Sequence, residues 1–129
     1  MAKGILFDSS ILIAAAEMGR DLIALLEERG DLPQWRVTIT NVVEEMERLA
    51  HKRSKKVSKM ARLALQLAKK LTILPGLEGV PTDEAIVRVA REKGLAVATI
   101  DASLRRRLRG EGVPVIYLKD GYPEWEGAL

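Results

Sequence analysis

The chain has 129 residues, of which 47% are hydrophobic and 30% are charged, and it contains no cysteine. These values are typical of one globular domain and exclude a disulfide-stapled scaffold or a thiolate metal site. No apolar run reaches the roughly 20 residues of a membrane helix, and Asp8 comes too early for a signal peptide. We therefore expect a single cytoplasmic domain over residues 1–129 with no membrane partner. Its few Asn and Gln residues are typical of heat-adapted, thermophile proteins.

The segments 4–7, 35–40, 71–74, 95–100 and 113–118 predict strands, because they are short, apolar and mostly rich in β-branched residues. Amphipathic stretches between them predict helices. This alternation indicates an α/β fold with three α/β/α layers and a central, mostly parallel sheet of four to five strands.

Two local features complete the predicted elements. Asn41, followed three residues later by Glu44, has the form of a capping box at the start of a helix. The tail 119–129 contains Gly121, Pro123 and Gly127 and is expected to be irregular.

The formal net charge of +3 is unevenly distributed along the chain. Residues 51–71 carry eight basic and no acidic side chains, whereas residues 1–50 carry five basic and nine acidic ones. Such a run is usually a solvated helix face, but it also suits the phosphate backbone of a nucleic acid.

Four acids lie where a parallel sheet can bring them together. Asp8 and Asp101 follow the ends of predicted strands, Asp83 lies in the first turn of a predicted helix, and Glu45 lies on the helix after 35–40. Each of them alone is explained as a helix cap or a solvated residue. As a set they would meet at the carboxyl edge of the sheet, where clustered carboxylates need protonation or a cation. Oxygen ligands of this kind suit Mg²⁺ or Mn²⁺.

Four short motifs contain these acids: Ile5-Leu6-Phe7-Asp8-Ser9-Ser10, Val42-Val43-Glu44-Glu45-Met46-Glu47-Arg48-Leu49, Asp83-Glu84-Ala85-Ile86 and Val97-Ala98-Thr99-Ile100-Asp101-Ala102-Ser103-Leu104. In this order the chain resembles the PIN-domain nucleases, which include toxin ribonucleases of toxin–antitoxin pairs and rRNA-processing endonucleases. The resemblance covers about residues 4–118 and favours Glu45 over Glu44 as the second acid.

The resemblance implies a Mg²⁺- or Mn²⁺-dependent endoribonuclease that hydrolyses RNA phosphodiesters. The implied metal-binding acids are Asp8, Glu45, Asp83 and Asp101, with Asp8 and Asp101 as the direct ligands and Ser10 and Thr99 as hydrogen-bonding helpers. Many family members carry a further acid two residues beyond the last Asp. Here that position is Ser103, which weakens the case for a second metal ion.

Basic residues flank this set of acids and would hold the RNA backbone. The candidates are Lys52, Arg53, Lys55, Lys56, Lys59, Arg105 and Arg106. The resemblance also implies a homodimer and an antitoxin or ribosome-assembly factors as partners. Leu22, Ile23 and Leu67 could supply the dimer contact or equally belong to the core.

Two other interpretations stay open. Ser103 and the basic block also suit a non-catalytic RNA- or ribosome-binding module that retains the fold. A phosphoacceptor receiver domain uses acids at strand ends as well, but it normally has paired acids after the first strand, where this chain has Ser9 and Ser10. The motifs around Asp83 and Asp101 look more like the rRNA-processing branch than the toxins.

Overall fold

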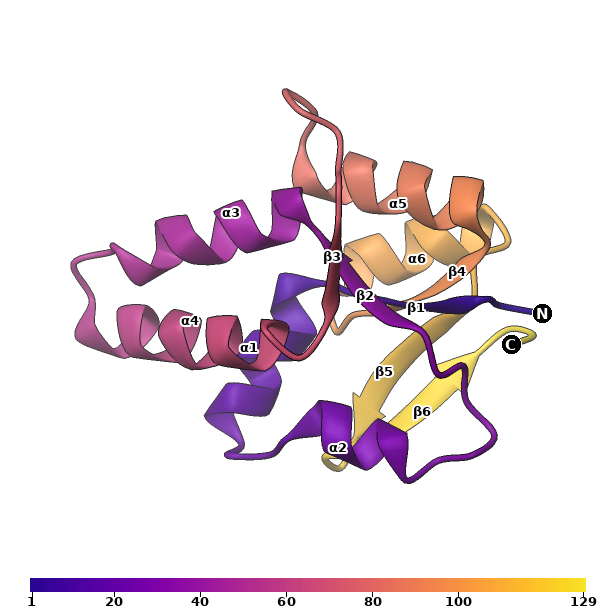
Figure 1. The fold of residues 1–129 in the computed structure, drawn as a ribbon, viewed down its shortest axis with the longest axis horizontal. Helices are drawn as coiled ribbons and strands as arrows, with labels where there is room; N and C mark the ends of the chain where they lie inside the picture. The colour runs from indigo at the N-terminus through magenta and orange to yellow at the C-terminus, as the bar shows by residue number, and fades with distance from the viewer.

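A computed structural model describes all of residues 1–129 and shows a six-stranded sheet with helices on both faces (Figure 1). The strands are β1 (Gly4–Phe7), β2 (Arg36–Ile39), β3 (Thr72–Leu74), β4 (Leu95–Ala98), β5 (Val115–Lys119) and β6 (Tyr122–Glu126). The helices are α1 (Ser9–Glu17), α2 (Leu22–Glu27), α3 (Thr40–Ala50), α4 (Lys55–Ala68), α5 (Thr82–Lys93) and α6 (Ala102–Gly110).

The order of the strands places a topological switch point at the centre of the sheet. The order is β3-β2-β1-β4-β5-β6, in which β1 to β5 are parallel and β6 is antiparallel to β5. The chain moves from β1 outward to β2 and β3, and then returns to add β4 on the other side of β1. The direction of winding reverses between β1 and β4, and in open α/β sheets ligands bind beyond the carboxyl ends of the strands at this point.

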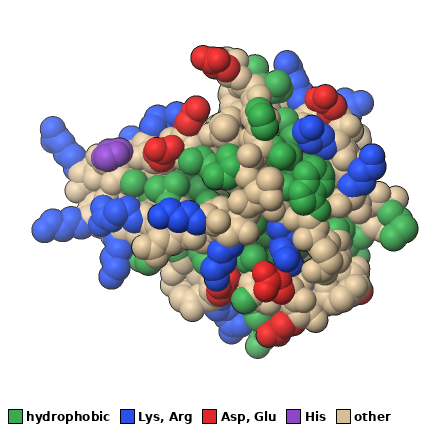
Figure 2. All heavy atoms as spheres, viewed as in Figure 1, with side chains coloured by type: hydrophobic (Ala, Val, Ile, Leu, Met, Phe, Trp, Pro, Cys, Tyr) green, Lys and Arg blue, Asp and Glu red, His purple; other side chains and the backbone are tan.

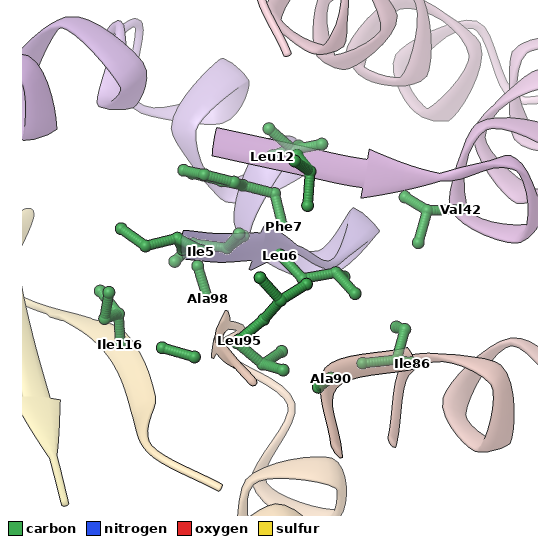
Figure 3. Packing of buried hydrophobic residues seen from close by; sticks show 14 of the residues in the cluster. Ile5, Leu6, Phe7, Leu12, Val42, Ile86, Ala90, Leu95, Ala98 and Ile116 are labelled. Carbon is green, nitrogen blue, oxygen red and sulfur yellow. The ribbon is translucent and has the colours of Figure 1, made fainter. Parts of the chain in front are cut away.

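Both faces of the central strands are buried, because successive side chains of a strand point to opposite faces. Ile5 and Phe7 lie on the side of Leu12 from α1, and Leu6 lies on the side of Ile86 from α5 (Figure 3). All of these side chains are fully buried. Strand β1 is therefore packed from both sides, so that its last residues hold a fixed position for the acid that follows it.

The helices are arranged in layers that leave the carboxyl edge accessible. Helices α5 and α6 lie on one side of the sheet, and α1 and α2 on the other (Figure 1). Helices α3 and α4 pack against each other as an antiparallel pair that extends beyond the carboxyl edge (Figure 1). None of the helices is both long and apolar enough to cross a membrane.

The expectation of an irregular tail over 119–129 is wrong, and the sheet has six strands rather than four to five. Asp120 and Gly121 have φ values of 53° and 81°, the left-handed conformation that both central residues of a type I′ hairpin turn require. This turn lets β6 pair with β5, and Pro123 is tolerated because β6 is an edge strand. The Asp-Gly pair was the available signal for the hairpin.

The residues suggested for a dimer contact are buried or half-buried. Leu22 and Ile23 on α2 are each 1% exposed and belong to the core. Leu67 on α4 is half-buried and packs against the same core. The core interpretation of Leu22 and Ile23 is therefore the correct one.

Candidate active site

Asp8 follows β1 and is the most buried acid of the site, with 4% exposure. Its Oδ1 accepts a hydrogen bond from the Ser9 amide at 2.8 Å, and thereby caps α1. Its Oδ2 accepts hydrogen bonds from Ser10 Oγ at 2.6 Å and from Thr99 Oγ1 at 2.8 Å. These donors fix the orientation of the carboxylate and offset the loss of water around its charge.

Thr99 connects the ends of the two central strands. Its fully buried hydroxyl, which donates to Asp8, also accepts a hydrogen bond from the Asp101 amide at 3.1 Å. Asp101 in turn caps α6, because its Oδ1 accepts from the Leu104 amide at 2.9 Å. Ser10 Oγ reaches across in the same way and accepts from the Ile100 amide at 3.1 Å. The two hydroxyls that the sequence singled out thus tie Asp8 to the segment that carries Asp101.

Glu45 reaches this group from the second turn of α3. Its Oε1 accepts a hydrogen bond from Ser9 Oγ at 3.1 Å, while the neighbouring Glu44 is exposed. Ser9 therefore contacts both Asp8, through its amide, and Glu45, through its hydroxyl. Ser9 is a site residue that was not predicted from the sequence, although its place directly after Asp8 was a usable signal.

Asp83 is distinguished from its neighbour Glu84 by its partners. Glu84 binds Arg88 of the same helix at 2.8 Å and also binds Arg107 of α6. These arginines lower the pKa of the Glu84 carboxyl, with Arg107 the larger cause. Asp83 has no ion-pair partner, so its carboxylate stays available at the N-terminal end of α5.

The charges of the other three acids act on Asp83. The pKa of Asp83 is raised above its usual value, first by partial loss of solvent and then by the charges of Asp8, Asp101 and Glu45. Arg107 acts in the opposite direction but does not cancel this effect. Carboxylates that repel one another in this way are stabilised by a cation between them.

The donor set fits a hard divalent ion, because it is made of carboxylate and hydroxyl oxygens only. However, the structure contains no group of three or more acidic, histidine or cysteine side chains placed closely enough to hold an ion directly. Charges interact over a Debye length of about 8 Å, whereas Mg²⁺ ligands lie at about 2.0–2.1 Å. The four acids therefore influence one another through their charges, but no three of them are close enough to bind one ion directly.

A latch of polar side chains connects the start of α3 to the loop before α5. Asn41 Nδ2 donates to the carbonyls of Leu77 and Val80 at 2.9 and 3.1 Å, and Asn41 Oδ1 accepts from the Leu77 amide at 2.9 Å. Thr40 Oγ1 accepts from the Gly76 amide at 2.9 Å. A Cβ at position 76 would collide with Asn41, so that glycine is required there.

The expected capping box is therefore wrong: α3 starts at Thr40, and Asn41 binds the loop in place of capping the helix. The hydrogen bonds between the Asn41 side chain and the loop outweigh its local preference to cap the helix. Because Asn41 and Glu45 are one helical turn apart and the loop leads into Asp83, the latch fixes the second acid relative to the third.

The basic block lies on the projecting end of the α3–α4 pair, where blue side chains gather in Figure 2. Lys52, Arg53, Lys55, Lys56 and Lys59 are all exposed. None of them takes part in an ion pair. These five positive charges are therefore free of acidic partners within the protein.

The candidate RNA-binding arginines of α6 differ from this block and from each other. Arg105 forms an ion pair with Glu126 and stacks on Tyr117, 3.9 Å from the ring centroid. Arg106 is exposed and has no ion-pair or hydrogen-bond partner in the protein. Ser103 is also exposed, in the first turn of the same helix.

Comparison with known proteins identifies the family. Residues 5–121 match the family described as PIN like domain, and the chain therefore belongs to the PIN-like domain family. PIN-domain proteins are generally nucleases that act on RNA and use divalent metal ions. No curated protein matches the chain.

Solved structures show the same fold. A structure described as the PIN domain endonuclease Utp24 has a TM-score of 0.81 at 23% identity, over 98% of this chain and 92% of that one. A domain of a functionally unknown protein from Methanocaldococcus jannaschii DSM 2661 has a TM-score of 0.62 at 20% identity, over 99% of both chains. PAE2754 from Pyrobaculum aerophilum has a TM-score of 0.55 at 20% identity, over 83% of this chain and 87% of that one.

Breaking the latch is expected to destabilise the protein. Asn41→Ala leaves backbone groups of the loop without partners, which we expect to lower the free energy of unfolding by about 1–3 kcal/mol. Gly76→Ala disrupts the same latch from the loop side, because its Cβ would collide with Asn41, and it should lower the free energy of unfolding by a similar amount. Urea unfolding measures both, with Gly30→Ala as the control, because a Cβ at position 30 meets nothing within 4 Å. Wild-type stability in Asn41→Ala would contradict the latch.

Removing the charge of Asp83 is expected to stabilise the protein near neutral pH in EDTA. Because the folded-state pKa of Asp83 is raised, the folded state binds its proton more tightly, and stability falls as pH rises from the unfolded value of 3.8 through the folded one. Asp83→Asn removes this loss, and because the group is exposed we expect a gain in melting temperature of only about 1–2 °C.

The gain should vanish below the ordinary Asp pKa and when Mn²⁺ is added to the wild-type protein. Thermal melts at a series of pH values test both expectations. An equal gain at all pH values would assign the effect to something other than repulsion among the four acids.

Proposed function

We propose that this chain is a Mg²⁺- or Mn²⁺-dependent endoribonuclease that hydrolyses RNA phosphodiester bonds at the four-acid cluster. The observation that supports it most is the hydrogen-bond chain in which Thr99 links Asp8 to the Asp101 amide and Ser9 links Asp8 to Glu45. The charges of these three acids also help to raise the pKa of Asp83, after its partial loss of solvent. This group follows β1 and β4, at the end of the sheet where ligands of open α/β sheets bind.

Each acid has a role that follows from its surroundings. Asp8 and Asp101 would hold the divalent ion, because their Oδ1 atoms cap helices and so fix both carboxylates at the carboxyl end of β1 and β4. Glu45 and Asp83, on the neighbouring helices α3 and α5, would hold waters of the ion or take up a proton. When bound, the ion supplies an activated water and neutralises charge on the phosphoryl oxygens.

Ser10 and Thr99 are positioning residues in this proposal. Both hydroxyls donate to Asp8 Oδ2, which holds that oxygen in one direction. Ser9 does the same for Glu45. The exposed Ser103 offers no carboxylate at the position of a further acid, so we propose one resident ion.

The RNA backbone would contact the basic block on the α3–α4 end. Lysine and arginine side chains elsewhere on the surface are often paired with acids of the same chain, as with Arg29, Arg91 and Lys70. The block has no such partners, so its charges are available for phosphates. Arg106 would add a contact on the other side of the acids.

The substrate of the proposed enzyme is RNA, with an rRNA-processing role favoured over that of a toxin by the motifs around Asp83 and Asp101. Ribosome-assembly factors would then be its partners rather than an antitoxin, and a homodimer would be its assembly. The second candidate function is a non-catalytic RNA-binding module, which Ser103 and the unpaired basic block also support.

Loss of cleavage in acid variants is the direct test of the enzyme. We expect Asp8→Asn and Asp101→Asn to lower the cleavage rate of labelled single-stranded and structured RNA in Mn²⁺ by at least about 100-fold, equivalent to about 2.7 kcal/mol of barrier. EDTA should abolish the wild-type activity. Glu92→Gln, an exposed acid on α5, is the matched control and should cleave like wild type.

The outcomes separate the two candidate functions. Cleavage that survives in both Asn variants would place the chemistry elsewhere. Metal-independent RNA binding without turnover by the wild-type protein would favour the non-catalytic module.

Neutralising the basic block should weaken RNA binding and reduce its dependence on salt. For Lys52→Gln/Lys56→Gln, two lost phosphate contacts predict that the slope of log K against log salt falls by about 1–2 on single-stranded RNA. The control Lys3→Gln/Lys119→Gln changes the net charge equally at exposed positions outside residues 51–71. Fluorescence anisotropy in EDTA measures both, and equal slopes for the two variants would contradict a role of the block.

A further inference from the structure

A second concentration of positive charge lies on the face of α6 that is turned toward β6. A pocket with a volume of about 390 Å³ is present there. Its lining consists of Ala102, Arg105, Arg106, Arg109 and Glu126. The four helical members are spaced three and four residues apart, so they form one stripe along α6.

The charges in this pocket are not balanced. Three guanidinium groups surround a single carboxylate, that of Glu126, which forms ion pairs with Arg105 and with Arg109 at 4.0 Å. Arg106 has no acidic partner, so the pocket keeps an excess of positive charge. A bound anion would satisfy this excess, and arginine clusters favour anions with several oxygens arranged for paired hydrogen bonds.

Two of the arginines are held in place by neutral contacts as well. Arg105 stacks on the ring of Tyr117, and Arg109 Nη1 donates to the carbonyl of Val113 at 3.1 Å. Arg109 also fills the space above Gly127, where a Cβ would collide with its guanidinium. Because these contacts do not need Glu126, the guanidinium groups would keep their positions when another anion replaces its carboxylate.

The pocket adjoins the proposed active site. Its first lining residue, Ala102, directly follows Asp101 at the start of α6. Arg107 of α6 instead forms an ion pair with Glu84 of α5. One side of α6 therefore contacts α5, and the other side lines the pocket beside β6. A nucleic-acid strand with one phosphate at the acids could thus place a neighbouring phosphate in the pocket.

We propose that the Arg105–Arg106–Arg109 pocket is a binding subsite for a second phosphate group of the RNA strand, and that Glu126 occupies this subsite in the free protein. The proposal rests on the proposed function for its substrate class. It adds that Glu126 competes with the phosphate, so that this carboxylate weakens RNA binding. The competing explanation is an ion-pair network that only fastens the C-terminal hairpin to α6.

The two explanations predict opposite effects of Glu126→Gln. The amide keeps the size of the side chain and can still accept a hydrogen bond from Arg105, but it removes the competing charge. We expect this variant to bind a fluorescein-labelled 12-nucleotide single-stranded RNA about three- to tenfold more tightly than wild type, measured by anisotropy in EDTA, a range that corresponds to about 0.7–1.4 kcal/mol. Arg106→Gln should bind it more weakly.

Glu124→Gln is the matched control, because it removes the same charge two residues earlier on the same strand and Glu124 has no ion pair. It should bind RNA like wild type. A 5′-phosphorylated and a 5′-hydroxyl RNA distinguish the source of the phosphate: equal gains indicate an internal phosphodiester, and a gain only with the 5′-phosphate indicates a terminal one.

The subsite would be overturned if Glu126→Gln and Glu124→Gln bound RNA with equal affinity and only Glu126→Gln had a lower melting temperature. The explanation would then be the ion-pair network that fastens the C-terminal hairpin to α6. RNA cleavage that is normal in that case would leave the proposed function standing. If Glu126→Gln binds RNA more tightly and the wild-type protein does not cleave RNA, the subsite is supported and the enzyme is rejected. The two proposals can therefore fail separately.

Discussion

Repulsion among four carboxylates at one edge of the sheet is the constraint on which the site depends. The protein meets it with donors rather than with paired cations: Asp8 alone accepts hydrogen bonds from one amide and two hydroxyls. Asp8 and Asp101 also stand at helix N-termini, where the helix dipole favours negative charge. Arg107, the cation that acts on Asp83, is held by Glu84. The remaining repulsion is what a divalent ion would relieve.

The topology of the sheet determines which acids can meet. Because β1 and β4 are neighbours with parallel register, from Gly4 opposite Leu95 to Phe7 opposite Ala98, the residues after them emerge side by side. Asp8 and Thr99 can then share a direct hydrogen bond across 91 positions of sequence. Helices α3 and α5, which contact each other, carry the other two acids, and the Asn41 latch joins the start of α3 to the loop before α5.

The sequence predicted the parts of this site that depend on strand ends, and it failed where the structure depends on contacts between distant segments. Asp8 and Asp101 follow apolar strands, so their places at one edge could be inferred from the α/β pattern. The partner of Asn41 could not, because a capping box and a tertiary latch begin with the same local residues. The β6 strand could not be predicted for a different reason. Gly121 and Pro123 usually interrupt a strand, but Asp120 and Gly121 also form a hairpin turn. The ion pair between Arg105 and Glu126 depends on that hairpin, and so it was out of reach as well.

Positive charge lies on both halves of the sheet, and the order of the strands determines where. The basic block belongs to the α3–α4 pair, which follows β2 and leads into β3, whereas the arginine pocket lies between α6 and β6 on the other half of the sheet. The acids lie between them, at β1 and β4. A single positive patch would attract a polyanion without orienting it, but positive groups on both sides of a negative centre favour a strand that crosses that centre. A phosphodiester backbone held at both flanks would bring an intervening phosphate to the acids, and a divalent ion there would turn their repulsion of that phosphate into attraction.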